Sequence, residues 1–303
     1  MHLIVGSTGT LGGRIATLLL ERGASVRALV RADSPARSQM LHTDPEHLAA
    51  LGAELVEGDL TRPESLVTAL EGARHVISTA SATKRPGDQG LGQVDVEGTA
   101  TLARLAAAAG VEQFVYVSAH GADANADLPI MHEKGLAEEA IVASGVPATI
   151  LRPTSFMQDW IGFVLGAQVR SAAPGSSVRV QLFDRGEAPT SFVHEADVAE
   201  LAVAVLGRDD AIGEALPLAA EAATYRALLR RIGAMMGTEI ELESLPPGGR
   251  ITTVPEPLAG FLEAMLAAKA SWPGVSVTTP ETAERFGLEL TTIDAYLREA
   301  FGG

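Results

Sequence analysis

Apolar positions in the first 150 residues follow two alternating spacings. Residues 11–19 carry a helical stripe of leucine and isoleucine that ends before Gly23, and residues 93–109 and 133–144 predict two further helices. Short β-prone runs separate these stretches, at Leu3–Val5, Val26–Val30, Glu54–Val56, His75–Ser78, Phe114–Val117 and Ala148–Leu151. The alternation predicts an α/β domain with a parallel sheet and helices on both faces.

The pattern changes after Arg152–Pro153. Clusters of proline and glycine interrupt the chain, and helical spacing returns at 195–207, 224–236 and 291–300. We therefore expect a first domain over 1–155 and a smaller α+β domain over 156–303. The helix at 195–207 is expected to pack back onto the first domain.

Composition excludes several classes of function. The chain has 303 residues and no cysteine, so disulfides, thiolate metal sites and thiol nucleophiles are ruled out. Its net charge of −15 disfavours binding to nucleic acid or to an anionic membrane surface. No run of 18 apolar residues occurs, and the N-terminus lacks the features of a signal peptide, which predicts a cytoplasmic protein without a membrane partner.

A glycine-rich turn follows the first β-prone run. Gly6, Gly9 and Gly12 stand between a predicted strand and a predicted helix. In a dinucleotide-binding turn the first glycine permits the tight turn, the second lets the backbone approach a pyrophosphate, and the third lets the helix pack on the sheet. The alternative is a strand-to-helix turn that binds nothing. The residues expected to contact a cofactor here are Gly6, Thr8, Gly9, Thr10, Leu11 and Gly12. With the parallel sheet, the turn predicts a Rossmann-type doubly wound fold.

Residues after the next three runs refine this cofactor site. Arg31 follows the second run, where an arginine favours NADP over NAD because it can bind the 2′-phosphate. Asp33 is near enough to contact a ribose, which would favour NAD. The alternative for Arg31 is a solvated surface charge. Ser34 and Arg37 are further candidates to assist Arg31.

Asp59-Leu60 is predicted to contact adenine, unless Asp59 only caps the turn before Pro63. The small residues Thr79, Ala80 and Ser81 leave room for a cofactor, unless they form an ordinary polar loop.

Several motifs together resemble a known family. They are Gly6-x-x-Gly9-x-x-Gly12, the run ending at Arg31, Gly58-Asp59-Leu60, Val115-Tyr116-Val117-Ser118, Lys134-x-x-x-Glu138 and Ser144–Pro153. The chain resembles the atypical short-chain dehydrogenases, in particular the NmrA-like and isoflavone-reductase-like group, densely over 1–160 and loosely over 200–303. The resemblance implies NADPH as cofactor and a C-terminal substrate domain. Some relatives reduce quinones, enones or phenolics, and others bind the dinucleotide without catalysis.

The resemblance places Ser118 and Lys134 at the serine and lysine of short-chain dehydrogenases. The tyrosine four residues before that lysine is replaced by Ile130. Lys134 is expected at the edge of an apolar helix face, with Glu138 pointing outward, and burial beside a nicotinamide cation would lower its pKa toward neutrality. It is therefore predicted to donate a proton or to hold the nicotinamide ribose. The alternative is a surface lysine paired with Glu138.

Other candidate residues are weaker. Phe156 and Met157 are predicted to floor a nicotinamide or substrate pocket, or simply to fill the core. His120 and His132 flank the predicted cleft as possible proton donors or ordinary loop residues, and no H-E-x-x-H motif predicts a metal.

Two functions remain open. The first is an NADPH-dependent reductase of a quinone, enone or related conjugated carbonyl, with this small-molecule hydride acceptor as its partner. The second is a non-catalytic NADP(H)-binding redox sensor or scaffold. The sequence leaves open whether the protein is a monomer or a homodimer.

Overall fold

The computed structural model describes residues 1–31, 44–82, 92–170, 172–173, 175–270 and 275–302. It divides into two units, which are described separately. Unit 1 comprises residues 1–153, 196–217 and 284–288, and unit 2 comprises 154–195, 218–283 and 289–303.

Unit 1 is built on a seven-stranded sheet in the order β10-β6-β5-β4-β1-β2-β3. In the part of this order that runs from β6 to β3, each strand pairs in parallel with the next. The order 3-2-1-4-5-6 is that of a doubly wound dinucleotide-binding sheet, which confirms the predicted fold class. The strands are β1 (His2–Val5), β2 (Val26–Val30), β3 (Glu54–Glu57), β4 (His75–Ser78), β5 (Gln113–Val117), β6 (Ala148–Pro153) and β10 (Ala215–Leu218).

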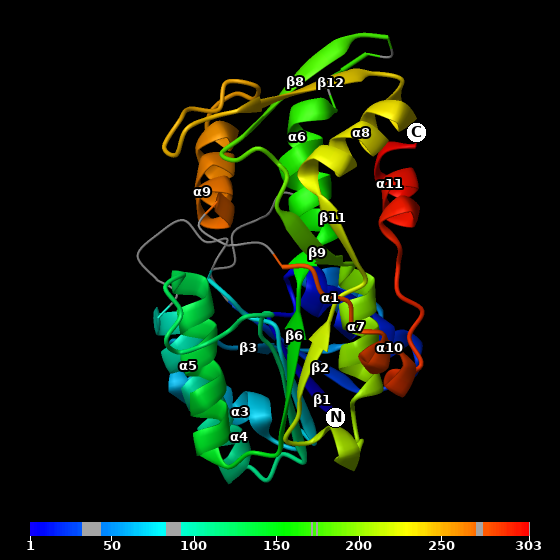
Figure 1. The fold of residues 1–303 in the computed structure, drawn as a ribbon. Coiled ribbons are helices and arrows are strands. Elements are labelled where there is room, and N and C mark those ends of the chain that lie inside the picture. The colour runs from blue at the N-terminus through cyan, green and yellow to red at the C-terminus, as the bar shows by residue number, and fades with distance from the viewer. Residues whose placement is uncertain (32–43, 83–91, 171, 174, 271–274, 303) are drawn as a thin grey trace. The chain divides into compact units, whose positions relative to one another are not determined.

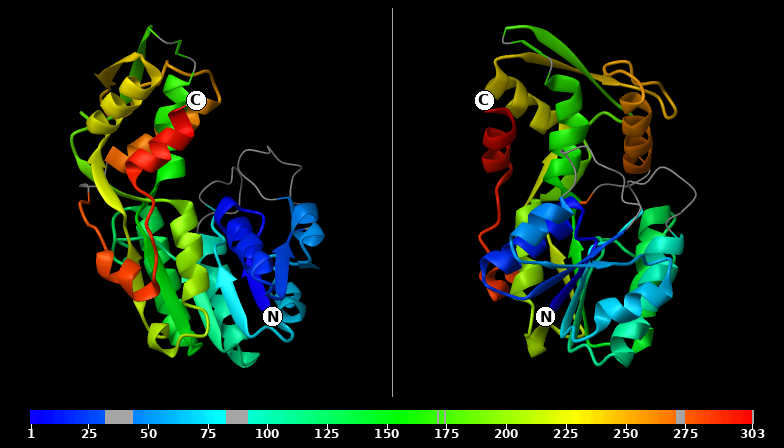
Figure 2. Two further views of the ribbon diagram at one scale, coloured as in Figure 1. Left: turned by 90° about the vertical axis from the view of Figure 1, so that its right-hand side faces the viewer. Right: turned by 180° about the vertical axis from the view of Figure 1, so that it is seen from behind.

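Helices cover both faces of this sheet (Figures 1 and 2). Figure 2 shows α1 and α7 on one face and α3, α4 and α5 on the other. Every residue of β4 and β5 is therefore buried, which explains their continuous apolar runs. The helices are α1 (Thr10–Glu21), α2 (Pro45–Ala50), α3 (Pro63–Leu70), α4 (Thr99–Ala108), α5 (Pro129–Ser144) and α7 (Glu195–Ala204). The short helix α10 (Pro280–Phe286) begins in unit 2 and ends in unit 1.

The helix predicted over 93–109 differs from the observed one. The segment Gly92–Gly98 (η1) forms π-helical turns, and regular α4 begins only at Thr99. At their junction Gly98 lies so close to Leu60 that an added Cβ would fall 2.8 Å from the Leu60 Cβ. The widened segment carries Asp95 into the interior, where this residue is fully buried.

Unit 2 contains short strands that the apolar pattern did not predict. Strands β7 (Ser155–Phe156), β9 (Pro189–Val193) and β11 (Glu221–Thr224) form one sheet, and β8 (Ser177–Leu182) pairs in parallel with β12 (Glu239–Ser244). Its helical segments are η2 (Gln158–Leu165), α6 (Gly166–Val169), α8 (Tyr225–Met236), α9 (Leu258–Ala270) and α11 (Ile293–Phe301). These elements enclose an apolar core of their own.

Two segments from the second half of the chain belong to unit 1. These are 196–217, which includes nearly all of α7, and 284–288. The structure thus groups them with residues 1–153 rather than with the contiguous stretch 156–303.

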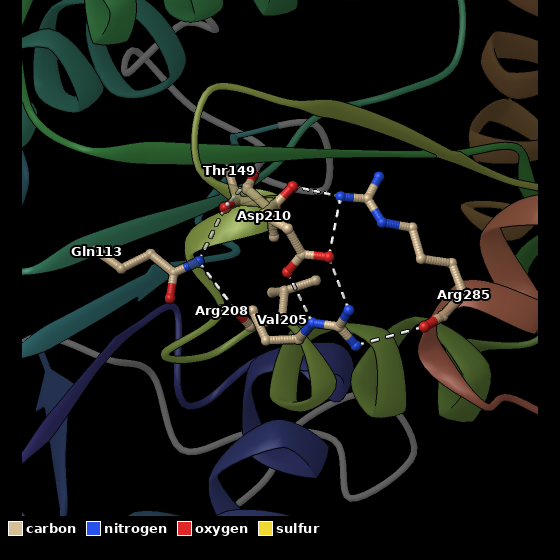
Figure 3. Close-up of polar contacts among 7 residues, drawn as sticks. Gln113, Thr149, Val205, Arg208, Asp210 and Arg285 are labelled. Atoms are coloured by element: carbon tan, nitrogen blue, oxygen red, sulfur yellow. Dashed lines mark hydrogen bonds and ion pairs between the residues drawn. The ribbon is translucent and has the colours of Figure 1, made fainter.

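Gln113 holds the segment after α7 against the sheet (Figure 3). Its amide nitrogen donates to the Thr149 hydroxyl at 2.9 Å and to the Val205 carbonyl at 3.0 Å, and its oxygen accepts from the Gly207 N–H at 2.8 Å. Thr149 in turn donates to the Ala211 carbonyl at 2.9 Å. Gln113 and Thr149 are almost fully buried, so these hydrogen bonds satisfy groups that water cannot reach.

We predict that Gln113→Ala lowers the free energy of unfolding by about 2–3 kcal/mol, because it removes the three hydrogen bonds that the Gln113 amide makes with Thr149, Val205 and Gly207. Urea denaturation measures the loss. Arg208→Ala, which removes the exposed contacts of this guanidinium with Asp210, the Arg285 carbonyl and the Phe286 ring, is the control and should cost at most about 1 kcal/mol. Equal losses in the two variants would contradict the role given to Gln113.

Candidate functional site

Two glycines let β1 and α1 meet without side chains between them. Gly6, with φ +88°, follows β1, and its carbonyl accepts from the Gly9 N–H at 2.9 Å. A Cβ on Gly12 would lie 2.2 Å from the Gly6 carbonyl oxygen, and one on Gly6 would lie 2.7 Å from the Thr79 Oγ1. Neither position has room for a side chain, so at Gly6 and Gly12 the turn consists of backbone alone.

The amino end of α1 has no side-chain cap. Its N-cap residue is Gly9, which has no side chain with which to make a cap hydrogen bond. Amides at this position carry the positive end of the helix dipole and favour an anion such as a pyrophosphate. Thr8 and Thr10 lie in this turn and are each engaged in a contact of their own, and Leu11 is buried beneath it.

The loop after β4 lies against the glycine turn. The Thr79 N–H donates to the Val5 carbonyl at 2.9 Å, and a Cβ on Gly6 would fall 2.9 Å from the Ala80 nitrogen. Ala80 and Ser81 follow and are partly buried, and Ser81 takes part in a further interaction. Thr79 and Ala80, predicted as cofactor residues, are therefore placed directly beside the glycine turn.

Arg31 directly follows β2 and is partly buried. This strand is tied to the glycine turn, because the buried Ser7 hydroxyl donates to the Leu29 carbonyl at 2.8 Å. Asp33, Ser34 and Arg37 lie outside the described residues. The preference for NADP that Arg31 suggested stays a prediction.

Asp59 and Leu60 are buried at the end of β3. One carboxylate oxygen of Asp59 accepts from the Thr61 N–H at 2.8 Å and from the Thr61 hydroxyl at 2.7 Å, which closes a turn ahead of α3. This is the turn-forming role that the sequence left open beside adenine contact. Asp59 has a further interaction, and contact with adenine stays a prediction.

Lys134 is buried in a polar cluster, with 6% of its surface exposed. Its ammonium nitrogen lies 3.2 Å from the Asp95 carboxylate, 3.1 Å from the Tyr116 hydroxyl and 3.4 Å from the Val117 carbonyl. The helix α5 comes close enough to bury it because Gly135 has no Cβ: one would fall 2.2 Å from the Ala124 nitrogen. The alternative of a surface lysine paired with Glu138 is therefore wrong.

The charge state of Lys134 also differs from the prediction. Burial lowers the pKa of its ammonium, but Tyr116 and Asp95 together raise it by more, so this pKa stands above its ordinary value. Burial has the opposite effect on the Tyr116 phenol: it raises the pKa of this group, which stays protonated at neutral pH. The expectation of a lysine with a nearly neutral pKa is corrected in this structure, because it did not include the Asp95 carboxylate.

Ser118 belongs to a second buried network. Its hydroxyl donates to the Glu138 carboxylate, which also accepts from the Arg152 guanidinium, at 3.1 Å for the Nε contact. Glu138 is 6% exposed, so its predicted outward orientation is wrong: Arg152 and Ser118 supply the partners that its burial requires. Because the Ser118 proton is committed to Glu138, the hydroxyl offers only lone pairs to a bound molecule.

Sequence reasoning missed Asp95 and Tyr116. Asp95 stands seven residues before Leu102, on the apolar stripe of the predicted helix, and a charge on such a stripe was a usable signal. Tyr116 gave no comparable signal, because β5 is buried on both faces and its residues show no alternation.

The remaining predicted residues are dispersed. Phe156 lies on β7 in unit 2, where it pairs with Val193 of β9. Burial and, to a lesser extent, Arg152 lower the pKa of His120, which leaves its imidazole uncharged at neutral pH. His132 is partly buried near the start of α5.

Two wider searches of the described residues were negative. They contain no group of three or more histidine, aspartate or glutamate side chains placed to hold a metal. None of the described helices has both the length and the apolar character that crossing a membrane demands.

Curated relatives resemble the chain over different lengths. It is 38% identical over 161 residues to the photosystem II assembly factor Ycf39 of Cyanophora paradoxa, which covers 53% of this chain and 47% of that protein. The chain thus spans about half the length of this relative. The Ycf39 protein of a Synechocystis strain is 28% identical across 99% of this chain and 90% of its own. The NAD(P)H azoreductase of Xenophilus azovorans is 28% identical across 72% of this chain and 67% of its own.

Solved structures share the fold along nearly the whole chain. The triphenylmethane reductase of Citrobacter sp. superposes with a TM-score of 0.80 at 20% identity, covering 100% of this chain and 99% of that one. The NADPH-dependent quinone oxidoreductase of Escherichia coli, solved with NADPH, gives 0.77 at 22% identity, covering 99% and 100%.

The family assignment rests on a match to nearly the whole chain. The model of the NmrA-like family matches residues 2–297. The motifs of the first 160 residues and the strand order of unit 1 agree with this match. The chain therefore belongs to the NmrA-like family.

Proposed function

We propose that this protein binds NADP(H) in unit 1 and reduces a quinone, an enone or a related conjugated carbonyl. One observation carries the proposal: a continuous set of contacts joins the glycine turn to Lys134. The loop after β4 touches Gly6, the Ala82 N–H of that loop donates to Asp95 at 2.8 Å, and Asp95 pairs with the Lys134 ammonium.

The residues present fit a dinucleotide. Gly6, Gly9 and Gly12 place no side chains in the turn, and the uncapped amino end of α1 would offer amides to a pyrophosphate. Arg31, directly after β2, would hold the 2′-phosphate of NADP. Lys134 would hold the nicotinamide ribose by exchanging its longest contact, the one to the Val117 carbonyl.

The electrostatics of the site favour a conjugated acceptor. When bound, the reduced cofactor supplies a hydride. Lys134 stays charged at neutral pH, so it would stabilise developing negative charge rather than give up its proton. A reduced quinone or an enolate is a much weaker base than a simple alkoxide, and water can protonate it without a dedicated acid. A site without the usual tyrosine suits such acceptors better than simple ketones.

Named relatives support a reductase. One structural neighbour is a quinone oxidoreductase solved with NADPH, another reduces triphenylmethane dyes, and a curated relative is an azoreductase. The acceptors of all three are conjugated systems.

A second function has a specific observation behind it. The Ycf39 protein of Synechocystis, which aligns over 99% of this chain, is named as an assembly factor for photosystem II. The alternative is therefore a protein that binds the dinucleotide and acts on a protein partner without turnover.

Steady-state assays should separate the two functions. We expect NADPH oxidation, followed by the absorbance of reduced nicotinamide, with quinones or enones and little with simple ketones. Tight NADPH binding without turnover on any of these acceptors would refute the reductase and favour the second function. Failure to bind NADPH would refute both.

Arg31→Ala tests the choice of cofactor. We expect it to weaken NADPH binding by about 1.5–3 kcal/mol, the range for a hydrogen bond to a charged group, and to leave NADH binding nearly unchanged. Isothermal titration of both cofactors measures the difference. An equal loss for NADH and NADPH would contradict the role given to Arg31.

Lys134 and Asp95 are best tested as a pair. Lys134→Met leaves the Asp95 carboxylate buried without its countercharge and should cost about 3–5 kcal/mol of stability. Adding Asp95→Asn removes both charges, so most of that stability should return in urea denaturation. Turnover should stay low in the double variant, because the positive charge is still missing. Recovery of turnover together with stability would show that Lys134 has only a structural role.

A further inference from the structure

Unit 2 contains a buried lysine outside the site described above. The buried side of α9 consists of Ala259, Leu262, Leu266 and Lys269. Lys269 thus continues an apolar stripe at helical spacing, where packing alone calls for another apolar residue. Only 7% of its surface is exposed, so most of the side chain is removed from water.

None of the described residues neutralises this ammonium by direct ion pairing. Among the described residues no carboxylate lies within ion-pair distance of Lys269, and its recorded contact is with the face of the Tyr225 ring, 5.9 Å from the ring centroid. Asp184 affects the Lys269 ammonium only by electrostatic attraction at longer range. The Asp184 carboxylate accepts a hydrogen bond from the Gly186 N–H at 2.7 Å. Burial lowers the pKa of Lys269 and Asp184 opposes this, so part of the desolvation cost stays uncompensated.

Tyr225 adds a second group that lacks a partner. It begins α8, is 1% exposed, and its hydroxyl has no hydrogen-bond partner in the described part of the chain. Burial and Asp184 raise the pKa of this phenol well above its ordinary value, so it keeps its proton and remains a donor. Two neighbouring side chains thus carry donors without acceptors, an arrangement that native interiors rarely leave unused.

We propose that Lys269 and Tyr225 form a binding site in unit 2 for the carboxylate of an aromatic or other apolar monoanion. The ammonium supplies the charge and the phenol a second donor. A phosphate or sulfate ion needs more donors than these two groups offer. The apolar body of the ligand matches the surroundings, because Tyr225, Leu262 and Leu266 belong to the apolar core of unit 2. The proposal does not require that the protein reduce anything.

Matched probes test the site in the full-length protein with saturating NADP⁺. Naphthalene-2-carboxylate and its uncharged amide have nearly the same shape, and calorimetry gives the affinity of each. We expect the carboxylate to bind about tenfold or more tightly than the amide. Benzoate serves as a smaller probe, and inorganic phosphate should bind more weakly than the naphthoate.

Variants locate the binding. Lys269→Met should reduce the preference for the carboxylate to about twofold or less, without lowering the melting temperature, because it removes a charge that is costly to bury. Lys269→Arg should retain part of the preference, and Tyr225→Phe should weaken carboxylate binding about threefold. Arg179→Met removes an exposed cation of unit 2 and is the control that should change neither affinity.

Several outcomes would overturn the proposal. They are equal binding of carboxylate and amide to the native protein, an undiminished preference in Lys269→Met, an equal loss in Arg179→Met, tighter binding of phosphate, and no binding of either naphthoate or benzoate. A drop in melting temperature for Lys269→Met with no change in ligand preference would show that the lysine only supports the fold.

Discussion

Removing an ammonium group from water is costly unless the protein supplies a countercharge and hydrogen-bond partners, and in unit 1 Asp95 supplies the countercharge to the buried Lys134. The pair joins α5 to the π-helical segment before α4, and Tyr116 adds a contact from β5. The second oxygen of Asp95 accepts from Ala82, which extends the set of contacts to the loop beside the glycine turn. One electrostatic constraint therefore fixes four elements at the edge of the sheet where a dinucleotide would bind.

The two buried acids near α5 do different work. Asp95 and Tyr116 keep Lys134 protonated, whereas Glu138 is already balanced by Arg152 and accepts a hydrogen bond from the Ser118 hydroxyl. A bound molecule would therefore meet a fixed positive charge at Lys134 and an acceptor at Ser118. This arrangement stabilises negative charge on an acceptor without supplying a strong acid, which agrees with a reductase of conjugated carbonyls.

The spacing of apolar residues and glycines along the sequence predicted those features that depend on interactions between residues close together in the chain. The strands of the first 150 residues, the ends of α1 and α5 at Gly23 and Gly145, and the glycine turn all follow from periodicity and backbone freedom. The partner of Lys134 did not, because it depends on a tertiary contact with Asp95, 39 residues earlier in the chain. Glu138 was misplaced for the same reason: the helical wheel of α5 contains no information about Arg152 on β6. The strands of unit 2 are short and bordered by proline and glycine, and too few positions remain for alternation to be visible.

The hydrogen bonds of Gln113 have a consequence for biosynthesis. Gln113 and Thr149 emerge from the ribosome long before residues 205–211, which supply their partners, and Arg285, which donates to Asp210 of the same region, emerges later still. While residues 154–195 and the segment after them are being made, the side chains of Gln113 and Thr149 therefore lack these hydrogen-bond partners. Such long-range closure raises contact order and slows folding. During translation, the first half of this chain therefore lacks contacts that complete unit 1 in the finished protein.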